Sequence, residues 1–157
     1  MNAKTQERIP EFLWRWMKPF NQRLAKNFSS RSRASRLVLI LTTQGRISGL
    51  PRRTPLQFEE IDGVYYVASA RGIQADWYRN ILANPEVEVH IQERHLQARA
   101  EAISDPGRIA DFLEIRVQRH PRMMSAMLRL EGLAPKFDRA ALEEFAARKA
   151  LVAIRPN

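Results

Sequence analysis

The 157-residue sequence contains no cysteine, so it forms no disulfide, no thiolate nucleophile and no thiolate metal site. Its three histidines, His90, His95 and His120, follow no spacing typical of metal ligands, which argues against a metal enzyme. The sequence also lacks the fingerprint GxGxxG, by which a strand and a helix bind a dinucleotide. A doubly wound fold is therefore disfavoured.

Long hydrophobic runs are missing as well. No run approaches the roughly 18 apolar residues of a membrane-spanning helix, and the first residues do not resemble a signal peptide. We therefore expect a cytoplasmic protein. With 45% hydrophobic residues, the chain has enough apolar material for one domain. Within it we expect an N-terminal amphipathic helix in residues 1–28, a basic linker over 29–36 and the main fold over 37–157.

The positive charge is concentrated near the N-terminus. Residues 1–53 hold 12 Lys or Arg against Glu7 and Glu11, a net charge of +10, whereas residues 54–157 hold 14 basic and 15 acidic residues, a net charge of −1. Solubility alone does not require this asymmetry. It favours an anionic partner for the first third: a phosphorylated cofactor, a nucleic acid or an acidic membrane surface.

Apolar residues recur at three- and four-residue intervals over about residues 5–28, which predicts a helix with one apolar face. Packing of this face on the domain is the simpler interpretation. Because the helix is basic and carries Trp14, Trp16 and Phe20, peripheral contact with a membrane surface is the alternative. Pro19 should kink or split the helix.

The rest of the chain alternates in strand-like fashion between short helical segments. We expect strands at about 36–43, 53–61, 64–69, 86–92, 95–103 and 151–154. Asp62-Gly63 predicts a tight hairpin turn, and Pro55 suits only a strand start or an edge. Helices are expected at about 77–82, with Asp76 as N-cap, at 106–119, from Pro121 to about 130, and at 140–149. This order predicts a small antiparallel β-barrel decorated by helices, a mainly β (α+β) fold.

The segment from Thr42 to Pro55, TTQGRISGLPRRTP, combines glycines, hydroxyls and arginines more densely than folding alone requires. Gly45 and Gly49 allow positive φ or close approach to a ligand. Three arginines supply planar positive forks, and Thr43, Ser48 and Thr54 supply hydroxyls that can donate to anionic oxygens. A phosphate would use all of these groups. The alternative is an exposed hairpin with solvated arginines.

These residues also carry a resemblance to a known family. The pattern GR-x-SG-x-PR from Gly45, then Thr54-Pro-Leu56, Ala68-Ser69 and WY-x-N-x-x-ANP from Trp77 resembles the deazaflavin-dependent nitroreductases. The match covers about residues 37–92, a little over a third of the chain. Two of its motifs lie far apart in the sequence and each fixes several positions, so the resemblance is specific.

The resemblance implies a split β-barrel of the FMN-binding type that binds coenzyme F420, a deazaflavin with a phosphate and an acidic tail. It implies hydride transfer from the reduced cofactor to a small-molecule acceptor such as a nitroaromatic or a quinone. Carried over by position, the residues that border phosphate and ring would be Arg46, Ile47, Ser48, Arg52, Arg53, Thr54, Pro55, Leu56 and Gln57. Those that close the site would be Val67, Ala68, Ser69, Ala70, Asp76, Trp77, Tyr78, Arg79 and Asn80.

Within this set, Ser69 is the candidate catalytic residue, as a hydrogen-bond donor to the ring or to an acceptor oxygen; a plain strand-end serine is the alternative. Trp77 and Tyr78 also suit a simple core position. Met123, Met124 and Met127 would line an adaptable acceptor pocket or pack in the core. Many relatives have a lysine where Ile47 stands, so one phosphate contact is either missing or supplied by Arg53.

Two other functions stay open. The same barrel could bind a flavin nucleotide such as FMN, or store the deazaflavin without turnover, and the missing lysine at Ile47 favours this. A nucleic-acid-binding module is supported only by the charge, since no recognition-helix or RNP-type aromatic signature is present. We expect no nucleic-acid partner, no metal, and a monomer or a homodimer.

Overall fold

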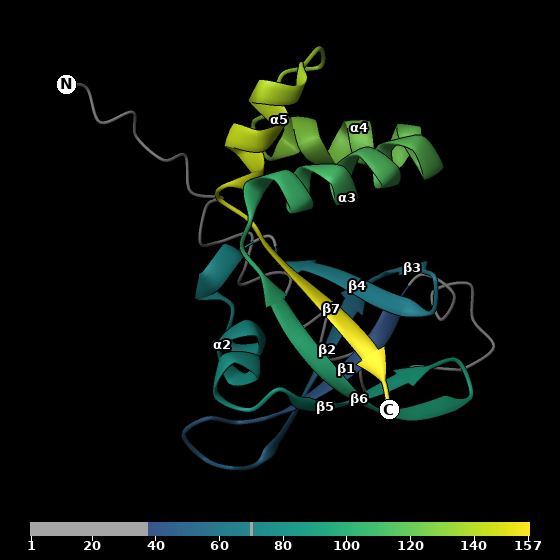
Figure 1. The fold of residues 1–157 in the computed structure, drawn as a ribbon, viewed down its shortest axis with the longest axis vertical. Helices are drawn as coiled ribbons and strands as arrows, with labels where there is room; N and C mark the ends of the chain where they lie inside the picture. The colour runs from purple at the N-terminus through teal and green to yellow at the C-terminus, as the bar shows by residue number, and fades with distance from the viewer. Residues whose placement is uncertain (1–37, 70) are drawn as a thin grey trace.

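The computed structural model describes residues 38–69 and 71–157; the predicted N-terminal helix, the basic linker and Ala70 lie outside the described residues. In this part of the chain one antiparallel sheet has the strand order β2-β1-β5-β6-β7-β4-β3, and it curls into a half-barrel (Figure 1). Its strands are β1 (Val38–Gln44), β2 (Pro51–Gln57), β3 (Glu59–Ile61), β4 (Val64–Ser69), β5 (Glu86–Ile91), β6 (Arg94–Ile103) and β7 (Ala150–Pro156).

Alternation along the strands forms the core inside the barrel. On β5 the side chains of Val87, Val89 and Ile91 are buried, as predicted, and they join inward residues of the other strands. The helix α2 (Asp76–Ala83) adds Trp77, Tyr78 and Ile81 to this cluster. Its apolar face therefore closes one end of the barrel, and this brings its polar face beside the end of β1.

A second core lies on the outer face of the sheet. Three helices, α3 (Pro106–Arg119), α4 (Pro121–Leu130) and α5 (Arg139–Ala146), pack together there, apart from α2 (Figure 1). Met124 is buried in this cluster, and Met123 and Met127 pack against it, so the methionines serve as core residues. Within residues 38–69 and 71–157, no helix is both long enough and apolar enough to span a membrane.

Most predicted elements are confirmed. The Asp62-Gly63 turn joins β3 to β4 with φ of 52° and 77°, the left-handed pair that a two-residue hairpin requires. Asp105 caps α3 by accepting from the Arg108 N–H at 2.8 Å, and Pro106 occupies the first turn.

One strand prediction is wrong. The segment predicted as a single strand over 53–61 is two strands, separated at Phe58, because β2 pairs with β1 whereas β3 pairs with β4. The chain therefore crosses the split of the barrel at this point. Pro55 lies within β2, which is an edge strand, so its missing N–H leaves no central ladder bond unmade.

Candidate functional site

The turn between β1 and β2, residues 45–50, forms a compact corner held by its own backbone. The Gly45 N–H donates to the Leu50 carbonyl at 2.8 Å, and the Gly49 N–H donates to the Gly45 carbonyl at 2.8 Å. Gly49 has a φ of +71°, which a residue with a side chain adopts only with strain. Ser48 Oγ accepts from the Leu50 N–H at 3.2 Å and from Arg52 Nη2 at 3.4 Å, so the hydroxyl links turn and strand.

Arg46 extends from this corner to α2. Its Nη1 donates to Asn80 Oδ1 at 3.0 Å and to the Asp76 carbonyl at 3.4 Å, while its Nη2 donates to Asp76 Oδ1 at 3.1 Å. The Arg46 side chain is 26% exposed and the Asp76 side chain 80% exposed. The structure thus brings together three of the predicted site residues, which come from two elements about thirty positions apart.

Asp76 is not the N-cap of α2, contrary to the prediction. Ala75 occupies the cap position without a side-chain bond, and Asp76 is the first helical residue. Its carboxylate pairs with Arg46 in place of the helix N–H groups.

Thr43 corrects a second expectation. Its side chain points inward and is 1% exposed, so the hydroxyl is not available to an anion outside the barrel. Instead, Thr43 Oγ1 accepts from Asn80 Nδ2 at 3.1 Å. This supporting role of Thr43 was not predicted from the sequence.

Strand β2 presents the other predicted cofactor-binding residues along the sheet edge. Arg52 and Arg53 are exposed, Thr54 and Pro55 are half-buried, and Leu56 packs against the barrel core. Gln57 is exposed, and its Oε1 accepts from Arg116 Nη2 at 3.3 Å.

The residues at the end of β4 are mostly turned into the protein. The Val67 side chain is fully buried in the barrel core, and Ala68 packs against the outer core. Ser69 is 3% exposed, and its hydroxyl donates to the Gly72 carbonyl at 2.8 Å. The hydroxyl hydrogen of the candidate catalytic serine is therefore already used within the protein.

On α2, Trp77 and Tyr78 lie in the barrel core with their rings edge to face, the core position that the sequence left open. Arg79 is exposed. At the tip of the corner, Ile47 is 91% exposed and Leu50 is 59% exposed. The corner therefore presents apolar surface next to its arginines.

A shallow cavity of about 220 Å³ lies beside the corner, on its β5 and β6 side. Two carboxylates, Glu86 and Glu88, line this cavity, so its charge does not suit a phosphate. The remaining lining comes from Thr42, Thr43, Gln44, Gly49, Pro51, Val87 and Gln97. An anion bound by the arginines of the corner would therefore lie outside this cavity.

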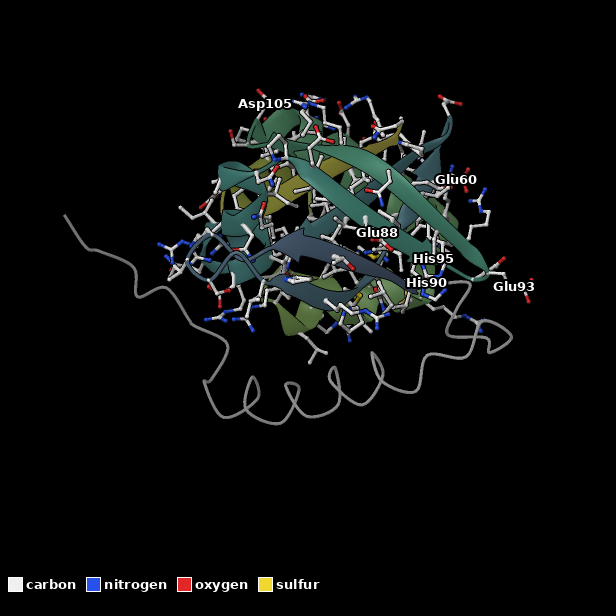
Figure 2. All side chains as sticks on the ribbon, turned by 90° about the horizontal axis from the view of Figure 1, so that it is seen from below. Glu60, Glu88, His90, Glu93, His95 and Asp105 are labelled. Atoms are coloured by element: carbon white, nitrogen blue, oxygen red, sulfur yellow. The ribbon has the colours of Figure 1, made fainter. Side chains whose placement is uncertain are left out.

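The β5–β6 hairpin brings two of the three histidines together (Figure 2). The rings of His90 and His95 stack with centroids 4.0 Å apart, and His95 Nδ1 lies 3.4 Å from Glu88 Oε1. Over the described ranges, no three His, Asp or Glu side chains are grouped so that they could hold a metal ion.

Comparison with solved structures identifies related folds. The chain is similar to the F420-H2 dependent reductase FDR-A, with 22% identity over 75% of this chain and 94% of that chain and a TM-score of 0.50. It is similar to HutZ, the heme storage protein from Vibrio cholerae, with 18% identity over 78% and 82% and a TM-score of 0.52. A conserved hypothetical protein, Rv2991 from Mycobacterium tuberculosis, gives 14% identity over 86% and 82% and a TM-score of 0.52.

At these identities the likenesses show the fold and nothing more, and they confirm the expected split β-barrel. The match of the sequence to a family is more informative than these structural likenesses. A profile of the F420H2-dependent quinone reductases matches residues 16–128, which include the corner, β2 and α2, and extends beyond the segment on which the resemblance was based. Since the match spans most of the chain, the protein belongs to the F420H2-dependent quinone reductase family.

Proposed function

We propose that this protein transfers hydride from reduced F420 to an activated small-molecule acceptor, a quinone or a nitroaromatic. Membership of the family makes the protein an F420-dependent oxidoreductase and makes coenzyme F420 its cofactor. What we propose beyond this is the class of acceptor and the residues that bind the cofactor. The proposal rests above all on the corner between β1 and β2, where Arg46 is held in place next to Gly45, a position with little room for a side chain.

The donors at this corner suit the anionic part of F420. Arg46, Arg52 and Arg53 are guanidinium groups, which bind phosphate and carboxylate oxygens in a bidentate manner. Ser48 accepts two hydrogen bonds and keeps its own hydroxyl hydrogen for an anionic oxygen. A Cβ at Gly45 would lie 2.7 Å from Ser48 Oγ, so the close approach of backbone and hydroxyl depends on glycine.

We assign the anion contact to Arg46, Ser48 and Arg52, with Arg53 supplying the cation that Ile47 does not. The stretch Thr54–Gln57 on the edge of the sheet, half-buried up to Leu56, would then support the ring. When bound, reduced F420 supplies the hydride, and the chemistry belongs to the cofactor. The protein contributes position and local electrostatics, because an anchored anion fixes where the rest of the cofactor lies.

We propose Ser69 as a hydrogen-bond donor only if its hydroxyl can change its partner. Its hydroxyl hydrogen would have to leave the Gly72 carbonyl before it could reach a ring or an acceptor oxygen. In the conformation seen here Ser69 instead fixes the start of the loop between β4 and α2. The remaining members of the predicted set, including Arg79, stay predictions, and Ala70 lies outside the described residues.

The test is a titration of the purified protein with reduced and oxidised F420, with FMN and with single-stranded DNA, followed by fluorescence. We expect micromolar F420 binding and oxidation of the reduced cofactor that depends on added quinone or nitroaromatic. FMN binding without F420 binding would favour the flavin-nucleotide alternative. F420 binding with no oxidation by either acceptor class would favour storage of the cofactor and contradict the proposed activity.

Two predictions about partners are unaffected by these results. The choice between monomer and homodimer stays a prediction. Membrane contact through the N-terminal helix concerns residues outside the described part of the chain.

A further inference from the structure

The Asn80 side chain is committed to other protein groups. It is 4% exposed, and its Oδ1 accepts from the Arg46 backbone N–H at 3.2 Å and from Arg46 Nη1 at 3.0 Å. Its Nδ2 donates to Thr43 Oγ1 at 3.1 Å, and Thr43 is itself 1% exposed. An amide oxygen offers two lone pairs, and here both accept from Arg46. Asn80 therefore has no acceptor capacity left for a ligand.

These contacts use one edge of the Arg46 guanidinium. Both Nη1 contacts and the Nη2 contact face α2, through Asn80 Oδ1, the Asp76 carbonyl and Asp76 Oδ1. The adjacent edge consists of Nε–H and the second Nη2 hydrogen. Among the residues that the structure describes, none accepts a hydrogen bond from Nε of Arg46. A pair of N–H groups on one guanidinium edge matches two oxygens of a phosphate or carboxylate.

The two contacts that hold Arg46 differ in strength. Asp76 is 80% exposed, and an ion pair open to solvent contributes little to fixing a side chain. The bonds to Asn80 are partly buried, and Asn80 is in turn fixed by a bond inside the barrel. Burial strengthens such bonds and makes their loss costly. Asn80 thus contributes most to the orientation of the guanidinium.

We propose that Asn80, supported by Thr43, is a positioning residue that fixes Arg46 so that its Nε edge meets an anionic group of F420, a phosphate being the best match. This inference rests on the proposed function, which assigns the anion contact to Arg46. It changes the role of Asn80 from a cofactor ligand to a residue that acts through Arg46. Holding the arginine before binding lowers the entropic cost of forming the contact.

A double-mutant cycle tests the proposal. The dissociation constant of F420 is measured by fluorescence for the wild type, Asn80→Ala, Arg46→Ala and the double variant. We expect Asn80→Ala to weaken binding about fivefold and Arg46→Ala about tenfold or more. In the Arg46→Ala background the further loss from Asn80→Ala should be no more than about twofold. Equal losses in both backgrounds would show that Asn80 contacts the cofactor itself and would overturn the proposal.

Two further measurements keep the test valid if Asn80→Ala is unstable. Asn80→Asp keeps the acceptor for Arg46, so in the cofactor-free protein its Arg46 backbone amide should exchange more slowly than that of Asn80→Ala; equal exchange in the two variants would overturn the positioning role. In the cofactor-free protein, the Arg46 backbone amide should exchange faster with solvent in Asn80→Ala than in the wild type. Unchanged exchange would also overturn it. If Arg46→Ala binds F420 as tightly as the wild type, the proposed anion site is wrong. If Arg46→Ala weakens F420 binding but Asn80→Ala does not, only the role of Asn80 is rejected.

Discussion

Gly45 shows how closely the corner is built at the level of single atoms. Its N–H donates to the Leu50 carbonyl, and an added Cβ would lie 3.1 Å from that oxygen and 2.7 Å from Ser48 Oγ. The Ser48 hydroxyl can rotate away from the added Cβ. The Leu50 oxygen is a backbone atom, so it can move away only if the backbone of the turn shifts. A methyl group at Gly45 therefore displaces the turn that carries Arg46.

We predict that Gly45→Ala weakens F420 binding about fivefold and lowers the free energy of unfolding by about 1 kcal/mol, as expected for mild overpacking. Fluorescence titration and urea unfolding measure the two effects. Gly107→Ala is the matched control, because its Cβ would meet only the Asp105 side chain, at 3.1 Å, in the first turn of α3. Equal F420 affinities for the two variants would mean that the turn geometry does not matter for binding.

For single residues, the sequence predicts which residues belong to the site better than it predicts where their side chains point. Arg46, Asp76 and Asn80 were all selected from the sequence, and the structure brings them together. Thr43 was expected to contact an anion, yet it shares the inward face of β1 with Leu39 and Leu41. The two-residue period of the strand could have shown this. The contact of Arg46 with α2 could not be found in this way, because it depends on how the helix closes the barrel.

Glu59 links the sheet to the layer of helices. Its carboxylate is 7% exposed and lies 3.4 Å from Arg116 Nε, 3.1 Å from Arg119 Nη1 and 2.7 Å from His120 Nε2. Burial lowers the pKa of the Arg116 guanidinium, and the charge of Glu59 partly offsets this effect. One carboxylate on the short strand β3 therefore meets three groups from the end of α3 and the start of α4.

We predict that Glu59→Gln lowers the free energy of unfolding by about 3 kcal/mol, because it removes the buried carboxylate that pairs with the buried Arg116. Urea unfolding measures this. The neighbouring Glu60→Gln is the control, since Glu60 is exposed and meets Arg119 through its backbone carbonyl. If both variants lose the same small amount, the Glu59 cluster does not hold the helices to the sheet.

Elements with a local signal were predictable from the sequence. The hairpin turn at Asp62-Gly63 and the helix over 106–119 agree with the structure because each is fixed by its own turn or cap residues. The division of residues 53–61 at Phe58 has no such signal. It follows from which distant strands the two halves pair with, and that choice is made by the closure of the barrel.

The two cores share the same strands. Along β7 the side chain of Val152 faces the barrel interior while that of Leu151 faces the helices, and both are buried. Loss of packing in either core would expose one buried apolar face of these shared strands to solvent. We therefore propose that residues 37–157 form one cooperative domain.

Hydrogen exchange at increasing denaturant concentration tests this proposal. Peptides from β5, in the barrel, and from α5, in the helical layer, should lose protection at the same denaturant concentration. Loss of protection in α5 well before β5 would show two separately stable units and reject the single domain.

For the whole molecule, the central claim is that the arginine-rich corner after β1 binds the anionic part of F420. It connects the positive charge of residues 1–53 with the cofactor that the family uses. The most direct measurement is the F420 dissociation constant of Arg46→Ala against that of Arg99→Ala. Arg99 is the control because its removal changes the net charge equally, while its partner is Glu86 on the neighbouring strand β5. We predict a loss of about tenfold or more for Arg46→Ala, from a charge-assisted contact of about 1.5 to 3 kcal/mol, and a much smaller change for Arg99→Ala. The same affinity for both variants would contradict the claim.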